Sequence, residues 1–149
     1  MRWLKNNSEL VEALAAAITA LVALAALVGV KLQLDATDRL QQAQSARDAY
    51  RSHLALAVAH PHFASPPDSC ALMAGPQAVA YYAYVDHLLY AAEQMLTTAD
   101  GWEDTFWAEL APHKTYVCSA GGLVDDGDKV FGLMSEYRAA NCADVPACP

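Results

Sequence analysis

The first hydrophobic pattern in the chain is an uninterrupted apolar run near the N-terminus. Residues 13–30 carry no charged side chain, and eight of these eighteen residues are alanine. A helix of this length rises about 27 Å, close to the roughly 30 Å hydrocarbon core of a bilayer. Helices of soluble proteins normally keep one polar face. The run therefore predicts a transmembrane helix over residues 9–32, after a cytoplasmic leader of residues 1–8.

A cleaved signal peptide is the alternative interpretation of this run. Arg2 and Lys5 precede the apolar residues, which fits either interpretation. However, the run is longer than the usual signal-peptide core of about 7–15 residues, and residues 29–33 (GVKLQ) make a poor cleavage site. The pattern favours a retained membrane anchor.

Small residues recur four positions apart in the predicted membrane helix. This spacing lets the backbone of a second helix approach closely, although chance matches are expected in so alanine-rich a segment. The candidate helix-packing positions are Ala13, Ala16, Ala17, Ala20, Ala25 and Gly29. The competing interpretation is that these positions face lipid.

Beyond the membrane run, the polar and apolar positions continue with a helical period. No Gly or Pro occurs between Lys31 and His60, so a single helix is expected from about residue 7 to about residue 59, leaving the membrane as a long stalk. The expected apolar stripe on this stalk is Leu40, Ala43, Arg47, Tyr50, Leu54 and Ala57.

Three shorter helices are expected in the remainder of the chain. The proline-rich residues 61–76 predict a loop, followed by helices over residues 77–99, 102–110 and 128–140. Pro112 is expected to end the helix over residues 102–110. The fold class predicted from these patterns is all-α, with residues 33–149 forming a small, disulfide-stapled helical bundle outside the membrane.

The buried faces of two of these helices follow from their periodicity. The helix over residues 77–99 is expected to bury one side, which holds Val79, Tyr82, Val85 or Asp86, Leu89, Ala92 or Glu93, and Leu96. Asp125 or Asp126 is a candidate N-cap for the helix over residues 128–140. The expected apolar face of that helix consists of Val130, Phe131, Met134 and Tyr137.

All the cysteines follow the membrane run. An even number of cysteines on one side of a membrane is typical of disulfides in an oxidising compartment, whereas four free buried cysteines in the cytoplasm is the alternative. Arg2 and Lys5 favour a cytoplasmic N-terminus. We therefore expect a bacterial inner-membrane protein whose C-terminal domain lies in the periplasm.

The cysteine positions allow three pairings. Cys70 and Cys118 are expected at the same end of the bundle, and Cys142 and Cys148 are near neighbours in sequence. The favoured prediction pairs Cys70 with Cys118 and Cys142 with Cys148.

The charge of the chain restricts its partners. The 149 residues carry a net charge of −8, and residues 33–149 hold fifteen Asp and Glu against six Lys and Arg, a net charge of −9. Nucleic-acid binding needs a basic surface, so we expect no nucleic-acid partner. An acidic outer domain attracts a basic periplasmic electron carrier by electrostatic steering.

No catalytic or cofactor motif stands out, so we expect no enzyme, no cofactor and no metal site. His60 and His62, with His53, Asp68 or His87, are the candidate metal ligands, but two histidines astride a proline do not converge reliably. The sequence has no Cys-x-x-Cys pair. Aromatic residues are concentrated between residues 81 and 107, and those left outside the core suit a protein interface. The candidate interface residues are Tyr81, Tyr84, Trp102 and Trp107.

The chain resembles a broad group of uncharacterised bacterial membrane proteins, in which an N-terminal hydrophobic helix leads through a stalk into a small helical domain. The matching stretches are residues 10–44, residues 50–63 ending in Ala-His-Pro-His-Phe, and residues 81–110 with Gly-Trp-Glu at 101–103. The four cysteines are not part of that pattern. The resemblance implies the architecture and carries no activity.

These expectations favour a non-catalytic, membrane-anchored accessory or scaffold subunit of a larger inner-membrane complex, with an electron-transport complex as the specific hypothesis. Its expected partners are integral membrane subunits and the lipid bilayer. The alternative hypothesis is a tethered periplasmic ligand-binding or sensing module, which predicts a concave pocket lined by tyrosines and histidines.

Overall fold

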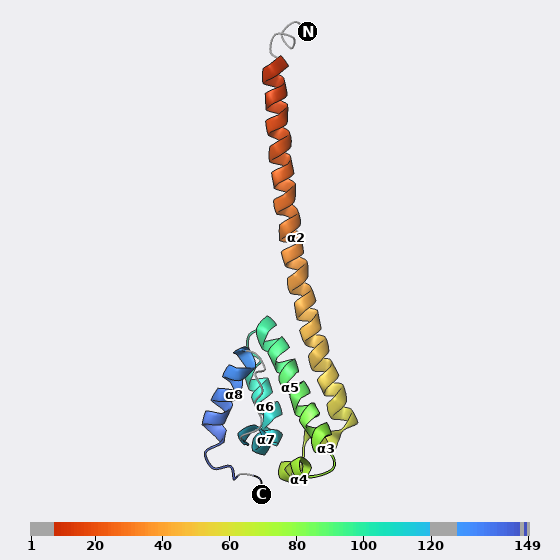
Figure 1. Ribbon diagram of the computed structural model, residues 1–149, viewed down its shortest axis with the longest axis vertical. Helices are drawn as coiled ribbons and strands as arrows, with labels where there is room; N and C mark the ends of the chain where they lie inside the picture. Colours follow the sequence, from red (N-terminus) through yellow and green to blue (C-terminus); the bar gives the residue numbers. More distant parts are fainter. Residues whose placement is uncertain (1–7, 120–127, 147, 149) are drawn as a thin grey trace. The chain divides into compact units, whose positions relative to one another are not determined.

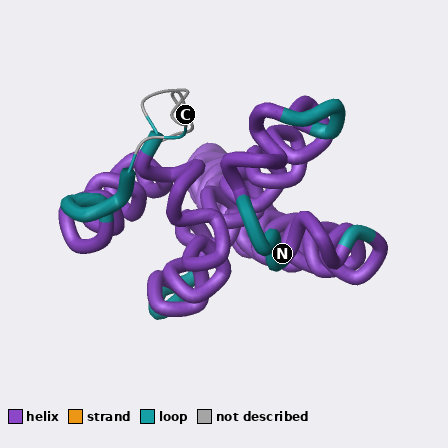
Figure 2. Tube along the Cα trace, turned by 90° about the horizontal axis from the view of Figure 1, so that it is seen from below, coloured by secondary structure: helices purple, strands orange, loops and turns teal. Residues whose placement is uncertain are grey.

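The computed structural model describes residues 8–119, 128–146 and 148. Every regular element among these residues is a helix, and no strand occurs in the described part (Figure 2). This confirms the predicted all-α fold class. The chain divides into two compact units, residues 1–41 and residues 42–149.

The first unit consists of the N-terminal part of helix α2, which spans Ser8–Ala59 without a break, as predicted (Figure 1). Its large apolar side chains from Leu10 to Leu34 are exposed, with Leu27 at 68%. The hydroxyl of Thr19 donates to the carbonyl oxygen of Ala15, so this polar group is satisfied inside the helix. Among the described residues, α2 is the one helix long and apolar enough to cross a membrane by length and composition, with a mean hydropathy of 2.5 in its best window.

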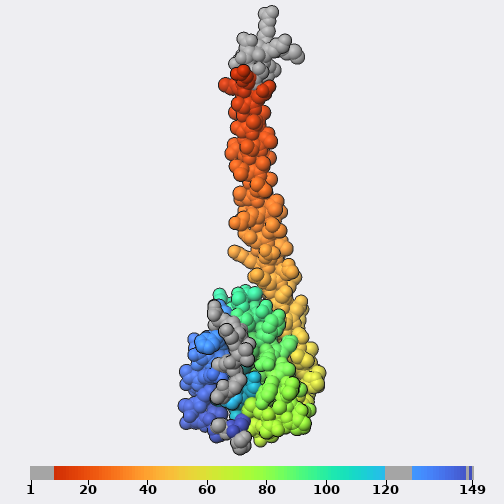
Figure 3. Space-filling view, in the orientation of Figure 1, coloured from red at the N-terminus to blue at the C-terminus, as the bar shows by residue number. Residues whose placement is uncertain are grey.

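The second unit is a helical bundle assembled from the end of α2 and the rest of the chain. The space-filling view shows the yellow to blue parts of the sequence, residues 42 onward, gathered into one body (Figure 3). Its further elements are α3 (Pro61–Ala64), α4 (Ser69–Ala74), α5 (Ala78–Thr98), α6 (Glu103–Leu110), η1 (Ala111–His113), α7 (Lys114–Cys118) and α8 (Asp128–Asn141). Helix α5 contacts both α4 and α8 and supplies nearly half of the core residues.

The prediction of a loop over residues 61–76 was wrong, because this segment contains α3 and α4. Pro61 occupies the first turn of α3, where its missing N–H costs no hydrogen bond. The Asp68 carboxylate accepts a hydrogen bond of 3.0 Å from the Ala71 amide and caps α4. Helix α6 ends at Leu110, just before Pro112, as predicted, but the short helical elements η1 and α7 that follow it were not predicted.

The apolar stripe predicted on α2 is rotated from the buried side of that helix. In α2, Ala46 and His53 are fully buried, whereas Leu40 is 67% and Leu54 39% exposed. The stripe was misread because a histidine counts as polar in a hydrophobicity pattern, so the position that faces the core was passed over.

Helices α5 and α8 bury most of the faces predicted for them. The correctly predicted core residues are Val85, Leu89, Ala92 and Leu96 on α5 and Val130, Met134 and Tyr137 on α8. The predictions were wrong for Val79, Tyr82 and Phe131, which are exposed, and they left out Tyr81, Leu88 and Leu133, which are buried. Helix α5 is apolar on most of its circumference, so periodicity alone does not select the side that meets its neighbours.

The N-terminus of α8 is capped from another helix. The predicted caps, Asp125 and Asp126, lie outside the described residues. A carboxylate oxygen of Glu93 on α5 accepts a 2.8 Å hydrogen bond from the Val130 amide in the first turn of α8. This contact fixes the start of α8 against α5 and places a negative charge at the positive end of the helix.

Glu93→Ala is expected to lower the free energy of unfolding of the second unit by about 1 kcal/mol, because it leaves the amide of the buried Val130 without its acceptor. Urea unfolding followed by tryptophan fluorescence measures this change. Glu136→Ala, at an exposed position on α8, is the matched control. Equal stability of the two variants would contradict the capping role.

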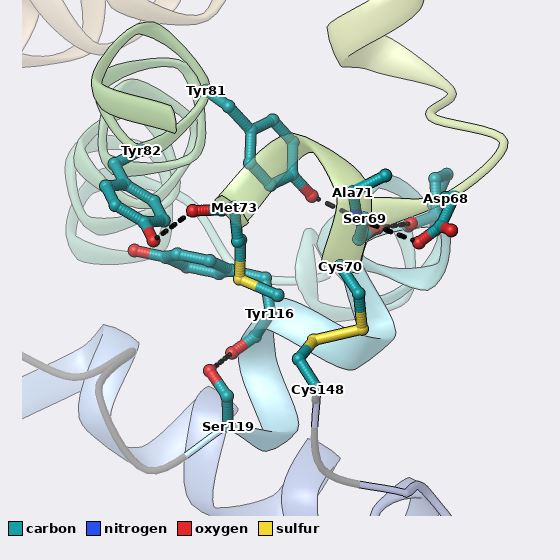
Figure 4. The surroundings of a disulfide bond; sticks show 11 residues. Asp68, Ser69, Cys70, Ala71, Met73, Tyr81, Tyr82, Tyr116, Ser119 and Cys148 are labelled. Atoms are coloured by element: carbon teal, nitrogen blue, oxygen red, sulfur yellow. Dashed lines mark hydrogen bonds between the residues drawn. A yellow bond between two sulfur atoms is a disulfide. The ribbon is translucent and has the colours of Figure 1, made fainter. Parts of the chain in front are cut away.

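Two disulfides join four segments at one end of the bundle. Cys70 in α4 pairs with Cys148, and Cys118 in α7 pairs with Cys142 after α8, with Cα–Cα distances of 5.3 and 5.4 Å. The surroundings of the first pair are drawn in Figure 4. Disulfide formation was predicted correctly, but the favoured pairing of Cys70 with Cys118 and Cys142 with Cys148 was wrong.

The reason for the wrong pairing lies in how the helices meet. Helix α4 contacts α7, and α7 contacts α8, so all four cysteines gather in the same region. Cys142 follows directly after α8 and lies beside Cys118, which leaves the tail to carry Cys148 to α4. Closeness in sequence was therefore a poor guide to which neighbour each thiol meets.

Candidate functional site

A groove of about 400 Å³ lies in the second unit where the end of α2 and helix α3 meet α5. Ala80 and Ala83 are exposed on α5, and their small side chains leave room between the helices. Tyr84 and Phe63 are each only 5% exposed and lie deeper. We call this feature the α2–α5 groove; its lining residues are Leu56, His60, Phe63, Ala80, Ala83, Tyr84 and His87.

A cluster of aromatic and imidazole rings lies next to the groove. The ring of His53 is 4.9 Å from that of Tyr84 and 5.8 Å from that of His87, with the two imidazoles nearly parallel at 19°. Nε2 of His53 lies 3.4 Å from the Tyr84 hydroxyl. The Nδ1 atoms of His53 and His87 are buried and have no hydrogen-bond partner among the described residues.

His113 occupies a second polar arrangement in the core. The Tyr81 hydroxyl donates to Ser69 Oγ at 3.3 Å (Figure 4), and Ser69 donates to the Pro112 carbonyl at 3.3 Å. Nδ1 of His113 lies 2.9 Å from the Tyr81 oxygen, and the tautomer of His113 decides which of the two groups donates in this contact. Both polar side chains are therefore hydrogen-bonded inside the core.

Burial shifts the pKa values of these side chains. Desolvation, with a smaller contribution from His87, lowers the pKa of His53 to about 4. Desolvation, with a contribution from His53, lowers the pKa of His113 to about 4. Burial raises the pKa of Tyr84 to about 12, helped by the nearby Glu109 and Tyr81. Both histidines are therefore neutral at pH 7.

A second cavity of about 360 Å³ lies around α4, lined among others by His62, Asp68 and Leu72. Its lining residues come from one continuous stretch of chain, residues 62–77. No group of three or more His, Cys, Asp or Glu side chains suited to hold a metal ion occurs among the described residues. The rings of His60 and His62 lie 6.0 Å apart, and the rings of His53 and His87 lie 5.8 Å apart.

Two of the four predicted interface residues are in the wrong place for that role. Tyr81 is fully buried and Tyr84 is 5% exposed, because both face the core side of α5. Trp102 and Trp107 are half-buried: Trp102 packs edge-on against Tyr50, and Trp107 packs edge-on against Tyr137. The two tryptophans keep part of their surface available to a partner.

The helix-packing positions predicted in the first unit lie along the exposed apolar part of α2. At roughly 100° per residue they fall on two different sides of the helix. Ala13, Ala16, Ala17 and Ala20 share one side, and Ala25 and Gly29 lie on the roughly opposite one. A Cβ added at Gly29 would meet no atom within 4 Å. A neighbouring helix can therefore contact only one of these sets at close range.

Sequence reasoning missed the cluster around His53 and His113. His53 was considered only as an accessory metal ligand, and His113 was not among the candidate residues. The available signal was spacing: His53 lies seven residues after the core residue Ala46 and so falls on the same side of α2. Comparison with protein families, curated proteins and solved structures finds no match to this chain.

Proposed function

We propose that the protein is a non-catalytic, single-pass accessory subunit of a larger bacterial inner-membrane complex. The observation that carries this proposal is the exposed apolar surface of α2 between Leu10 and Leu34, which has no packing partner among the described residues. A surface of this size is unstable in water, and a bilayer or partner helices would cover it. The high alanine content favours neighbouring protein helices over lipid alone.

The proposed orientation places the N-terminus in the cytoplasm and the second unit in the periplasm. Arg2 and Lys5 support it by the positive-inside rule. The pairs Cys70–Cys148 and Cys118–Cys142 support it because such bonds persist in an oxidising compartment. The excess of acidic residues after residue 32 favours a basic electron carrier as the soluble partner of an electron-transport complex.

Purification in a mild detergent tests this function. Integral membrane subunits are expected to co-purify with the tagged protein in a fixed ratio. Ala17→Leu enlarges the side that holds Ala13 and Ala20 and should reduce recovery of the partners several-fold, because close helix approach needs small residues. Ala26→Leu adds the same apolar bulk elsewhere on the helix and should leave recovery unchanged. Recovery of the unaltered protein as a lone monomer would overturn the proposal.

A tethered periplasmic ligand-binding or sensing module is the second candidate function. The α2–α5 groove favours it, since the groove is concave and two histidines and a tyrosine line it. In this case the membrane helix serves only as a tether, and a lone monomer with a small molecule retained through purification is the expected result.

A further inference from the structure

We propose that the α2–α5 groove binds an uncharged, mainly apolar small molecule that carries a hydrogen-bonding carbonyl or hydroxyl group. This inference rests on the second candidate function and gives it a site and a ligand class. Three features of the groove carry it: the chemistry of its walls, an imidazole whose Nδ1 lacks a partner, and an opening formed by alanines.

The walls of the groove select against charge. No Asp, Glu, Lys or Arg lines it, and Leu56, Phe63 and the ring of Tyr84 supply apolar surface. A charged ligand would lose hydration there without gaining an ion pair. The volume of about 400 Å³ is at the small end of ligand pockets, which suits a molecule of two or three fused or linked rings.

The polar recognition comes from the imidazoles. His87 lines the groove, and its ring lies nearly parallel to the His53 ring, with the ring centroids 5.8 Å apart. Its Nδ1 is buried without a partner among the described residues. A half-turn of the ring about its terminal torsion exchanges this nitrogen with a carbon. With Nδ1 turned toward the groove, a carbonyl or hydroxyl group of a ligand provides the hydrogen bond that this nitrogen lacks.

The opening of the groove is formed by small, exposed side chains. Ala80 and Ala83 lie about one helical turn apart on α5, and both are exposed. A large residue at either position would fill the space between α5 and α2. Substitution at Ala83 therefore tests the groove without disturbing the core.

Benzophenone is the probe, because it is uncharged, carries two rings and a carbonyl, and cross-links to nearby C–H bonds under near-ultraviolet light. The full chain in detergent is irradiated with it, and the attachment sites are mapped by peptide mass spectrometry. We expect cross-links within residues 56–63 and 80–87. Probe dissolved in the micelle should also label residues 9–34. The amount of this labelling is the internal control for the light dose in each sample.

Ala83→Trp should reduce groove labelling at least ten-fold, while Ala139→Trp, at an exposed position on α8, should leave it unchanged. Unlabelled fluorenone should compete at a lower concentration than fluorene, which has the same rings without the carbonyl. His87→Leu should remove this difference, which is expected to be roughly 2- to 10-fold for one hydrogen bond. Groove labelling that survives Ala83→Trp, or equal competition by both compounds in the unaltered protein, would overturn the inference.

Native mass spectrometry of the purified full chain separates this inference from the function on which it rests. A small molecule retained by both the unaltered protein and the Ala83→Trp variant would support a ligand-binding module and reject this groove as its site. Absence of any retained molecule together with absence of groove labelling would reject both.

Discussion

Proteolysis of the unreduced protein is expected to yield one peptide that joins Cys70 to Cys148 and another that joins Cys118 to Cys142. Trypsin leaves Cys142 and Cys148 together in residues 139–149, so a second cleavage before Asp144 is needed to separate them. After both digestions each cysteine lies in its own peptide. A peptide joining Cys70 to Cys118 would contradict the structure and restore the pairing favoured by the sequence.

Removing these bonds should have the largest effect of any substitution in the second unit. The Cys118–Cys142 bond closes a loop of 24 residues and the Cys70–Cys148 bond one of 78. From the loss of loop-closure entropy in the unfolded chain, the paired Cys→Ser changes are expected to cost about 3 kcal/mol and about 4 kcal/mol, respectively. Urea unfolding followed by tryptophan fluorescence measures both values.

The matched comparison uses the unaltered protein in the reduced state. Reduction should lower its stability by more than either paired substitution alone, since it opens both loops. In the Cys118→Ser/Cys142→Ser variant, reduction should lower the free energy of unfolding only by the contribution of the remaining Cys70–Cys148 bond. An unfolding midpoint that does not change on reduction would show that the bonds are absent from the sample or do not constrain the unfolded chain.

The sequence predicted the long elements of this fold well. The absence of Gly and Pro after Lys31 identified α2, and the apolar run over residues 77–99 identified α5 to within a residue at each end. These predictions succeeded because few secondary structures other than a helix are compatible with such long periodic segments. The short helices α3, α4 and α7 were missed, because prolines were taken to end helices rather than to begin or redirect them.

The candidate site was much less predictable than the fold. Which side of α5 faces the core depends on where α2 and α8 lie, and no local pattern carries that information. His53 and His113 are polar residues that tertiary packing has buried among aromatic rings. The groove exists because Ala80 and Ala83 face α2 at a place where larger residues would fill it, which is visible only once the helices are placed.

Acidification is expected to destabilise the second unit between about pH 6.5 and pH 4. The pKa of His53 and the pKa of His113 are each lowered to about 4 in the folded state, chiefly by burial, from an ordinary value near 6.5. In this range the unfolded chain binds protons that the folded chain does not, so stability falls as the pH falls. The stabilisation is complete above pH 6.5 and is lost by about pH 4.

The groups that face these histidines do not offset the effect. Helix α5 presents Tyr84 and His87 to His53, and neither supplies a negative charge near neutral pH. His113 faces Tyr81 and, through it, Ser69 of α4. The carboxylate that influences this region is Glu109, which acts on Tyr84 rather than directly on either imidazole. Among residues 8–119 and 128–146, no buried carboxylate is available to pair with an imidazolium in the core.

The expected loss in the free energy of unfolding is at most about 3 kcal/mol per histidine, because each pKa is about 4 in the folded state and near 6.5 in the unfolded chain. Free energies of unfolding measured from pH 7.5 to pH 4 in the full chain give the dependence of stability on pH. His53→Leu should remove about half of this pH dependence, even if it changes stability at pH 7.5. His62→Leu, at an exposed position, should leave the slope unaltered. A stability that is constant down to pH 5 would show that the two imidazoles gain protons in the folded state, and hence that the core opens to solvent around them.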